Sequence, residues 1–188
     1  MRYTFFIAAL LLLIACAPVR KIVKQEYPSP FQFELVDTVN ADKNYIFVKA
    51  HEWISKTYGS AKTVIDMQDK EAGKLIGKAQ MTVKIDYVTM YGPIVHTDVV
   101  RYIMSIDCKD GKYRCRISDF YHEGGGFGET KYQDYGSLDQ EAIYVNSGST
   151  GKPVESKTFY EVKNQAMYNA KVILADLKKA MHQKDEDF

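Results

Sequence analysis

Alternation of apolar and polar residues dominates the middle of the chain and predicts a series of β-strands. The clearest run is 77–87, where the odd positions carry apolar residues or glycine and every even position is polar or charged. Because successive side chains of a strand point to opposite faces, this pattern predicts a long, half-buried strand. The same alternation predicts shorter strands over 31–35 and 63–67, and Gly92-Pro93 is expected to end the long strand.

Two further alternating runs, 99–108 and 113–121, flank the dipeptide Asp110-Gly111. Asp-Gly between two such runs is a strong signal for a β-hairpin. The apolar face of this hairpin is expected to carry Tyr102, Met104, Ile106, Cys108, Tyr113, Cys115 and Ile117.

Two segments show the three-to-four-residue spacing of amphipathic helices. The first is expected to begin at a cap formed by Asn40 or Asp42 and to run to about Tyr58, where Gly59 ends it. The second is expected over 156–182. The predicted order is β-α-β-β-β-β-α, an α+β fold in which helices cover the single apolar face of an antiparallel sheet.

Residues 121–152 form a long connection that holds seven of the twelve glycines. Loops of this length are usually functional or disordered. The alternatives are therefore a mobile binding loop with aromatic contacts and a flexible insertion, within which a short helix is expected over 138–144. As a binding loop, 121–155 would contact a ligand through Tyr121, Phe127, Tyr132, Tyr135 and Tyr144.

The first sixteen residues have the pattern of an export signal. A basic start precedes the apolar run 3–15, which is too short to span a bilayer and fits the apolar region of a signal peptide. The run ends Leu13-Ile14-Ala15-Cys16, which resembles a bacterial lipobox. In that class of signals the cysteine thiol is acylated with diacylglycerol, and cleavage makes the cysteine the new N-terminus.

The lipobox implies a signal peptide over 1–15, a lipid on Cys16, an extended tether over 16–30 and a single domain over 31–184. The membrane is then a partner through the acylated cysteine. Ala17 follows the cysteine, whereas Asp at this place favours inner-membrane retention in lipoproteins. We therefore expect an exported, outer-membrane lipoprotein that faces the periplasm.

The order of elements and several local sequences resemble a domain family of unknown function with a TBP-like fold, common in exported bacterial lipoproteins. The matching features are the strand ending ELVDTV, the helix that carries Trp53, the entry GKLIGKAQ and the hairpin YIMSIDCKDGKYRCRISDF. The resemblance covers about 31–120 and the last helix. It implies an antiparallel sheet with helices on one face, and no activity, cofactor or site residue.

Charge argues against nucleic acid as a partner. The chain of 188 residues has 25 Lys and Arg against 24 Asp and Glu, so it lacks the net positive field of a nucleic-acid binder. TBP itself binds DNA through a duplicated basic sheet, and this chain has one repeat. The charged side of the predicted sheet is expected to be a solvated face on which Asp107 pairs with Arg114 or Arg116; it carries Lys78, Lys84, Asp86, Arg101, Asp107, Arg114 and Arg116.

Two cysteines remain after Cys16. If Gly111-Lys112 forms the hairpin loop, Cys108 lies opposite Cys115, and if Asp110-Gly111 forms it, the two thiols are offset. Both registers place the thiols on the core face. An oxidising compartment favours a disulfide, whereas poor cross-strand geometry disfavours one, so a disulfide and two buried free thiols both remain open.

No motif in the chain predicts catalysis, a metal or a cofactor. The pairs His96-x-Asp98 and His122-Glu123 each offer two ligands, fewer than the four of a structural zinc site. A G-x-S-x-G nucleophile motif and a phosphate-binding loop are absent from the sequence. The sequence therefore predicts a non-enzymatic envelope module that binds an unknown protein or small ligand. The alternatives are an envelope hydrolase with a site near 121–152 and a structural protein that works as an oligomer.

Overall fold

The protein is described here by a computed structural model that covers residues 25–89, 92–127, 130–131, 133–146 and 153–183. The predicted signal peptide, Cys16 and most of the predicted tether lie outside these residues, as does Tyr132. The elements in chain order are β1 (Phe33–Thr38), α1 (Lys43–Tyr58), α2 (Ala61–Val64), β2 (Ile65–Asp69), β3 (Lys74–Thr89), β4 (Gly92–Lys109), β5 (Lys112–Glu123), β6 (Gly126–Phe127), β7 (Thr130–Lys131), β8 (Gly136–Ser137), β9 (Tyr144–Asn146), β10 (Pro153–Glu155) and α3 (Lys157–His182).

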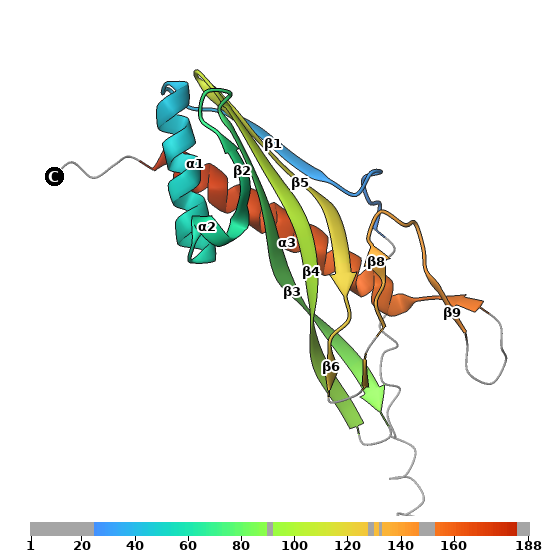
Figure 1. The fold of residues 1–188 in the computed structure, drawn as a ribbon. Coiled ribbons are helices and arrows are strands. Elements are labelled where there is room, and N and C mark those ends of the chain that lie inside the picture. Colours follow the sequence, from blue (N-terminus) through green and yellow to red (C-terminus); the bar gives the residue numbers. More distant parts are fainter. Residues whose placement is uncertain (1–24, 90–91, 128–129, 132, 147–152, 184–188) are drawn as a thin grey trace, which may run out of the picture.

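The main sheet is antiparallel, and its strands follow the order β1-β5-β4-β3-β2, with β8 paired to β5 as the sixth strand. Helices α1 and α3 pack on one face of this sheet (Figure 1). The predicted α+β class and the predicted placement of the helices are confirmed. Among the described residues, no helix combines the length and the apolar character needed to cross a membrane.

Both long helices begin and end where the sequence predicts. Asp42 caps α1, because its carboxylate accepts a hydrogen bond from the backbone N–H of Tyr45, and Gly59 ends the helix with a φ of 75°. Ser156 caps α3 in the same way by accepting from the N–H of Phe159. A side-chain oxygen at this position satisfies one of the free N–H groups of the first turn.

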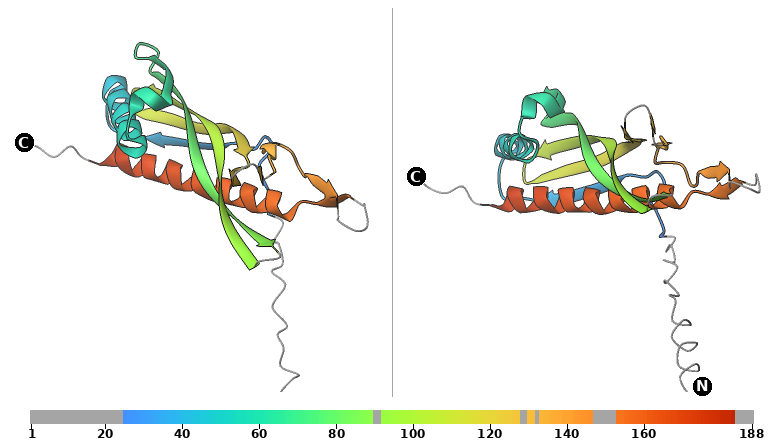
Figure 2. Two further views of the ribbon diagram at one scale, coloured as in Figure 1. Left: turned by 60° about the horizontal axis from the view of Figure 1, so that its bottom comes forward. Right: turned by 90° about the horizontal axis from the view of Figure 1, so that it is seen from below.

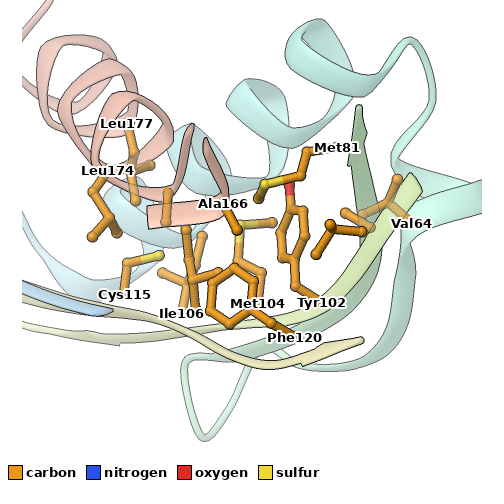
Figure 3. Close-up of a cluster of buried hydrophobic side chains, with 14 of the residues drawn as sticks. Val64, Met81, Tyr102, Met104, Ile106, Cys115, Phe120, Ala166, Leu174 and Leu177 are labelled. Atoms are coloured by element: carbon orange, nitrogen blue, oxygen red, sulfur yellow. The ribbon is translucent and has the colours of Figure 1, made fainter. Parts of the chain in front are cut away.

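The core lies between the sheet and the two helices. The odd positions 79–85 of β3 are buried, as are all seven residues predicted for the apolar face of the β4–β5 hairpin. Figure 3 shows part of this cluster, in which Met104 and Cys115 from the sheet face Leu174 and Leu177 from α3. Trp53 of α1 is buried as well, and its indole N–H donates to Asp176 of α3 over 2.8 Å.

Helix α3 crosses the sheet diagonally, so it contacts β1 at one edge of the sheet and β3 toward the other (Figure 2). Near its start, the side chain of Gln165 binds the edge of β3: its amide oxygen accepts from the N–H of Lys84 and its amide nitrogen donates to the C=O of Lys84. Near its end, His182 contacts Asp37 of β1 at 2.8 Å. Side chains of α3 therefore occupy hydrogen-bonding positions at one sheet edge that another strand would otherwise use.

The segment before β1 is packed from Tyr27 onward, within the region predicted as tether. The Tyr27 hydroxyl donates to Asn164 of α3 over 2.8 Å. The ammonium group of the buried Lys163 lies 4.7 Å from the centre of the Tyr27 ring and 5.0 Å from that of Phe31, and it donates to the C=O of Gln140. The cation–π contacts tie the N-terminal segment to α3. The hydrogen bond to Gln140 ties the 133–146 segment to the same part of the helix.

Two local predictions are wrong. The strand predicted from Thr63 begins only at Ile65, because residues 61–64 form the helical turn α2. The turn buries Val64 against Gly77, where an added Cβ would lie 3.0 Å from the Val64 carbonyl oxygen.

The expected helix over 138–144 is also not formed. Its place is taken by a turn, a bend and the start of β9. Side chains of this segment make hydrogen bonds to the backbone instead. Gln140 donates to the C=O groups of Tyr135 and Ser137, and Asp139 accepts from the N–H of Phe31. These contacts replace the hydrogen bonds of a helical turn.

Candidate functional site

The charged face of the sheet carries cross-strand ion pairs. Arg114 contacts Asp107 at 2.8 Å, which is one of the two expected pairings, and Arg116 contacts Glu34 of β1 at 2.8 Å. Arg101 contacts Glu123, also at 2.8 Å. Each of these exposed arginines is paired with a neighbouring carboxylate, as expected for a solvated sheet face.

The two cysteines are buried free thiols in the structure. The hairpin turns at Asp110-Gly111, so Cys108 pairs with Tyr113 and Cys115 pairs with Ile106. Of the two registers compatible with the sequence, this is the one that offsets the thiols. Burial raises the pKa of both thiols to about 12, which keeps them in the protonated, unreactive form at neutral pH.

The aromatic residues expected to form a contact loop are separated by the structure. Tyr121 lies on β5 and Tyr144 on β9, and both are exposed. Tyr135, in contrast, belongs to the core: its ring lies 5.0 Å from that of His122, and its hydroxyl accepts from Ser156. Phe127 lies in the short strand β6. The structure therefore corrects the placement of Tyr135 in a ligand-contact set.

Beneath this connection lies a buried cluster centred on Asp98 of β4. Its carboxylate contacts Nδ1 of His96 at 2.6 Å and Nε2 of His122 at 3.1 Å. It also accepts from the backbone N–H of Gly125 over 2.8 Å. Asp98 and His122 are fully buried, while the side chain of His96 keeps 17% of its surface exposed.

Hydrogen bonding assigns the proton of His122. Its Nδ1 accepts from the backbone N–H of Tyr135, so in the neutral ring Nε2 carries the hydrogen and donates to Asp98. Burial lowers the pKa of His122 below its ordinary value, although the neighbouring Asp98 opposes the shift. The cluster therefore consists of a buried carboxylate that accepts three hydrogen bonds, one of them from a neutral imidazole.

Gly125 is the part of the glycine-rich segment that the cluster requires. A Cβ at this position would lie 2.3 Å from Cε1 of His96 and 3.0 Å from the Asp98 carboxylate. Only glycine allows the backbone to approach the cluster this closely. The N–H of the adjacent Gly124 donates to Asp134, so the glycine run is bonded both to β4 and to a later part of the same connection.

In the sequence, His96-x-Asp98 and His122-Glu123 are two separate pairs of potential ligands. The structure joins His96, Asp98 and His122 across two strands, whereas Glu123 pairs with Arg101 on the other face. Within the described residues, no group of three or more His, Cys, Asp or Glu side chains is arranged to hold a metal ion. The hydrogen bonds around Asp98 already occupy the carboxylate that a metal would need.

A separate cavity of about 680 Å³ opens beside β3. Pairing between β2 and β3 ends at Ile65–Gly77, and the contacts of α3 with the β3 edge begin at Thr82, whose C=O accepts from Asn169. The strand edge between these points faces the cavity, which is lined by Tyr58, Thr63, Val64, Lys78, Ala79, Gln80, Arg101, Tyr102, Ile103 and Asp119.

Two tyrosines and a β-bulge shape this cavity. The hydroxyls of Tyr58 and Tyr102 lie 2.7 Å apart and share a hydrogen bond. The register of β4 and β5 shifts between Arg101 and Ile103, and Asp119 in this bulge has a φ of 55°. Bulges of this kind redirect side chains and occur often beside functional sites. The sequence has no motif for this cavity. Its lining residues come from five elements, and the cavity exists only because the pairing of β2 with β3 ends at Gly77.

The fold places the protein in the TBP-like class, with an antiparallel sheet covered by helices on one face. The model of the family described as "Domain of unknown function (DUF4468) with TBP-like fold" matches residues 33–123. The protein belongs to this family, as the sequence resemblance implied.

Two solved structures share the fold. A DUF4468 family protein from Bacteroides ovatus is 15% identical, with a TM-score of 0.59 over 87% of this chain and 92% of that one. A TBP-like protein from Parabacteroides distasonis is 18% identical, with a TM-score of 0.60 over 86% of this chain and 98% of that one. At these identities the likeness concerns the fold alone. Comparison with the curated proteins found no match.

Proposed function

We propose that the protein is a lipid-anchored envelope lipoprotein whose domain binds a small ligand or a partner's side chain and catalyses no reaction. The anchor rests on Leu13-Ile14-Ala15-Cys16 at the end of a short apolar run. A diacyl group on Cys16 supplies two chains, and two chains hold a protein stably where a single one holds it only marginally.

The cavity beside β3 is the observation that carries the binding role. It combines an apolar wall with the Tyr58 and Tyr102 hydroxyls, which suits a small amphipathic group. The charged side chains of its lining are engaged by neighbours: Lys78 pairs with Asp66, and Asp119 accepts from Ser118.

The anchor is tested by Cys16→Ser in the native host. We expect the wild-type protein in the membrane fraction and the variant in the soluble fraction, because the variant has no thiol to acylate. Membrane association that is unchanged by the substitution contradicts the anchor. Mass analysis of the wild-type N-terminus provides the direct check for diacylglycerol.

The binding role is tested by filling the cavity. Thr63→Trp places an indole in the cavity mouth, and Lys62→Trp places the same group on the adjacent exposed position of α2, which does not line the cavity. We expect native mass spectrometry and pull-down from native envelopes to recover the same ligand or partner with wild-type and Lys62→Trp protein. Thr63→Trp should lose it. Equal recovery with both variants argues against the cavity as the site.

One observation favours an envelope hydrolase as the second candidate. His96 Nδ1 lies 2.6 Å from the buried Asp98 carboxylate, and a carboxylate in this position orients an imidazole as a general base. If the protein hydrolyses an envelope polymer, His96→Gln abolishes the turnover of polymer fragments while Thr63→Trp leaves it intact. Absence of turnover by the wild-type protein excludes this candidate.

A further inference from the structure

The outer end of the β3–β4 hairpin extends beyond the rest of the sheet. Pairing between β4 and β5 ends at Val99–Glu123, whereas β3 and β4 remain paired with each other down to Thr89–Gly92. The last contact that α3 makes with this edge through Gln165 is at Lys84. The hairpin end therefore projects as a two-stranded ribbon, as Figures 1 and 2 show.

This end of the hairpin exposes an aliphatic side chain on each of its faces. Ile94 and Val95 are consecutive strand residues, so their side chains point in opposite directions, and their exposed fractions are 43% and 63%. Residues 92–95 include no charged residue, and Asp86 lies opposite Val95 across the hairpin. Exposed aliphatic side chains gain free energy when they move from water into the boundary between lipid headgroups and acyl chains, where a neighbouring carboxylate can stay among the headgroups.

The tether leaves the domain close to this hairpin. Tyr27 is held by Asn164 of α3, and the next residue, Gln165, holds Lys84 of β3. Cys16 lies eleven residues before Tyr27, which allows a reach of about 40 Å when extended. The hairpin turn lies five residues beyond Lys84, or about 17 Å along the strand. A lipid on Cys16 thus keeps the hairpin end within reach of the same membrane.

We propose that Ile94 and Val95, at the end of the β3–β4 hairpin, insert into the surface of the membrane that holds the lipid of Cys16. The inference rests on the proposed lipid anchor. Two exposed aliphatic side chains form too small a surface to hold a free protein on a membrane. A short tether, however, raises the local concentration of the membrane surface to about the millimolar range, so a weak contact is populated.

The test uses the full acylated chain reconstituted into vesicles of phosphatidylethanolamine and phosphatidylglycerol. Val95→Cys is labelled with an environment-sensitive fluorophore, and Val36→Cys serves as the matched control. Val36 is 60% exposed and pairs with Arg114 toward the opposite end of the sheet. The native Cys108 and Cys115 are buried, and labelling of the wild-type chain measures their background. Nitroxide-labelled lipid is then added as a contact quencher.

We expect both labelled proteins to float with the vesicles and the nitroxide lipid to quench the label at position 95 several-fold more than the label at position 36. Flotation with equal quenching at the two positions overturns the hairpin contact and leaves the anchor intact. Failure of the wild-type chain to float overturns the anchor and this proposal with it. A third outcome is a label at position 95 that is shielded from water but not quenched by the nitroxide lipid, in a protein of doubled mass. This outcome shows that the hairpin contacts a second copy of the chain, and it overturns the membrane contact.

Discussion

Replacement of Gly125 by alanine tests whether the cluster around Asp98 holds the glycine-rich connection on the sheet. The added Cβ would lie 2.3 Å from Cε1 of His96, whereas ordinary contacts begin at 3.4 Å, so the ring or the backbone must move by about 1 Å. Overpacking of this kind costs about 1–3 kcal/mol. If the ring turns away instead, His96 loses its hydrogen bond to a carboxylate, which contributes about 1.5–3 kcal/mol.

We therefore expect Gly125→Ala to lower the free energy of unfolding by about 1.5–3 kcal/mol. For a domain of this size, this corresponds to a decrease in Tm of about 3–12 °C. Urea and thermal unfolding of the Cys16→Ser chain, followed by circular dichroism, measures both quantities without the proposed lipid.

A double-mutant cycle with His96→Ala shows whether the clash is the cause. His96→Ala removes the ring, so a methyl group at position 125 costs less in that background, and we expect a coupling energy of about 1–2 kcal/mol. Additivity within about 0.5 kcal/mol would refute the reasoning, as would a Gly125→Ala variant that is as stable as the wild-type protein.

Three other predictions follow from the described contacts. Cys108 and Cys115 should resist iodoacetamide at pH 8 in the native protein and react fully in urea, since burial raises the pKa of both thiols to about 12; a mass two daltons below the reduced value would instead show a disulfide. The folded-state pKa of His122 lies below its ordinary value of 6.5, so its contribution to stability is complete above pH 6.5 and falls as the pH decreases below this value. The free energy of unfolding, measured in urea at pH 7.5 and at pH 5.5, should change less between the two pH values for His122→Gln than for the wild type. Equal changes contradict the lowered pKa of His122. Gln165→Ala leaves the N–H and C=O of Lys84 without their side-chain partner; we expect a loss of about 1–2 kcal/mol and concentration-dependent association in sedimentation velocity, and a fully monomeric variant argues against edge protection.

The long elements were predictable because local signals agreed with the tertiary fold. Asp42 and Gly59 delimit α1 as the sequence predicts, and Ser156 begins α3. The alternation over 77–87 and around Asp110-Gly111 identifies the residues that form the sheet side of the core. In these segments the side chains that favour the element also face its buried side, so propensity and packing select the same structure.

The candidate sites depend on contacts that local patterns do not encode. The Asp98 cluster joins β4 to β5 through a bulge that changes which residues of β5 face the helices, so the spacing of His122 from Asp98 carries no signal. Val64 is buried and Thr63 exposed, opposite to the predicted strand, because Gly77 lets α2 approach β3 closely. The sequence predicts an exposed Tyr135 in the long connection. The residues that bury it, His122 and Ser156, are distant in the sequence and leave no local signal.

The position of α3 in the chain also determines when the core can form during synthesis. Tyr27 and Asn164 are 137 residues apart, and Trp53 and Asp176 are 123 apart, yet both pairs are joined directly. The ribosome therefore releases the whole sheet before it releases the helix that covers the apolar face. Until then the apolar face of the sheet lacks the helix that covers it and remains open to capture by a chaperone. Because α3 follows every strand of the sheet in the chain, the fold is completed only after the sheet has been synthesised.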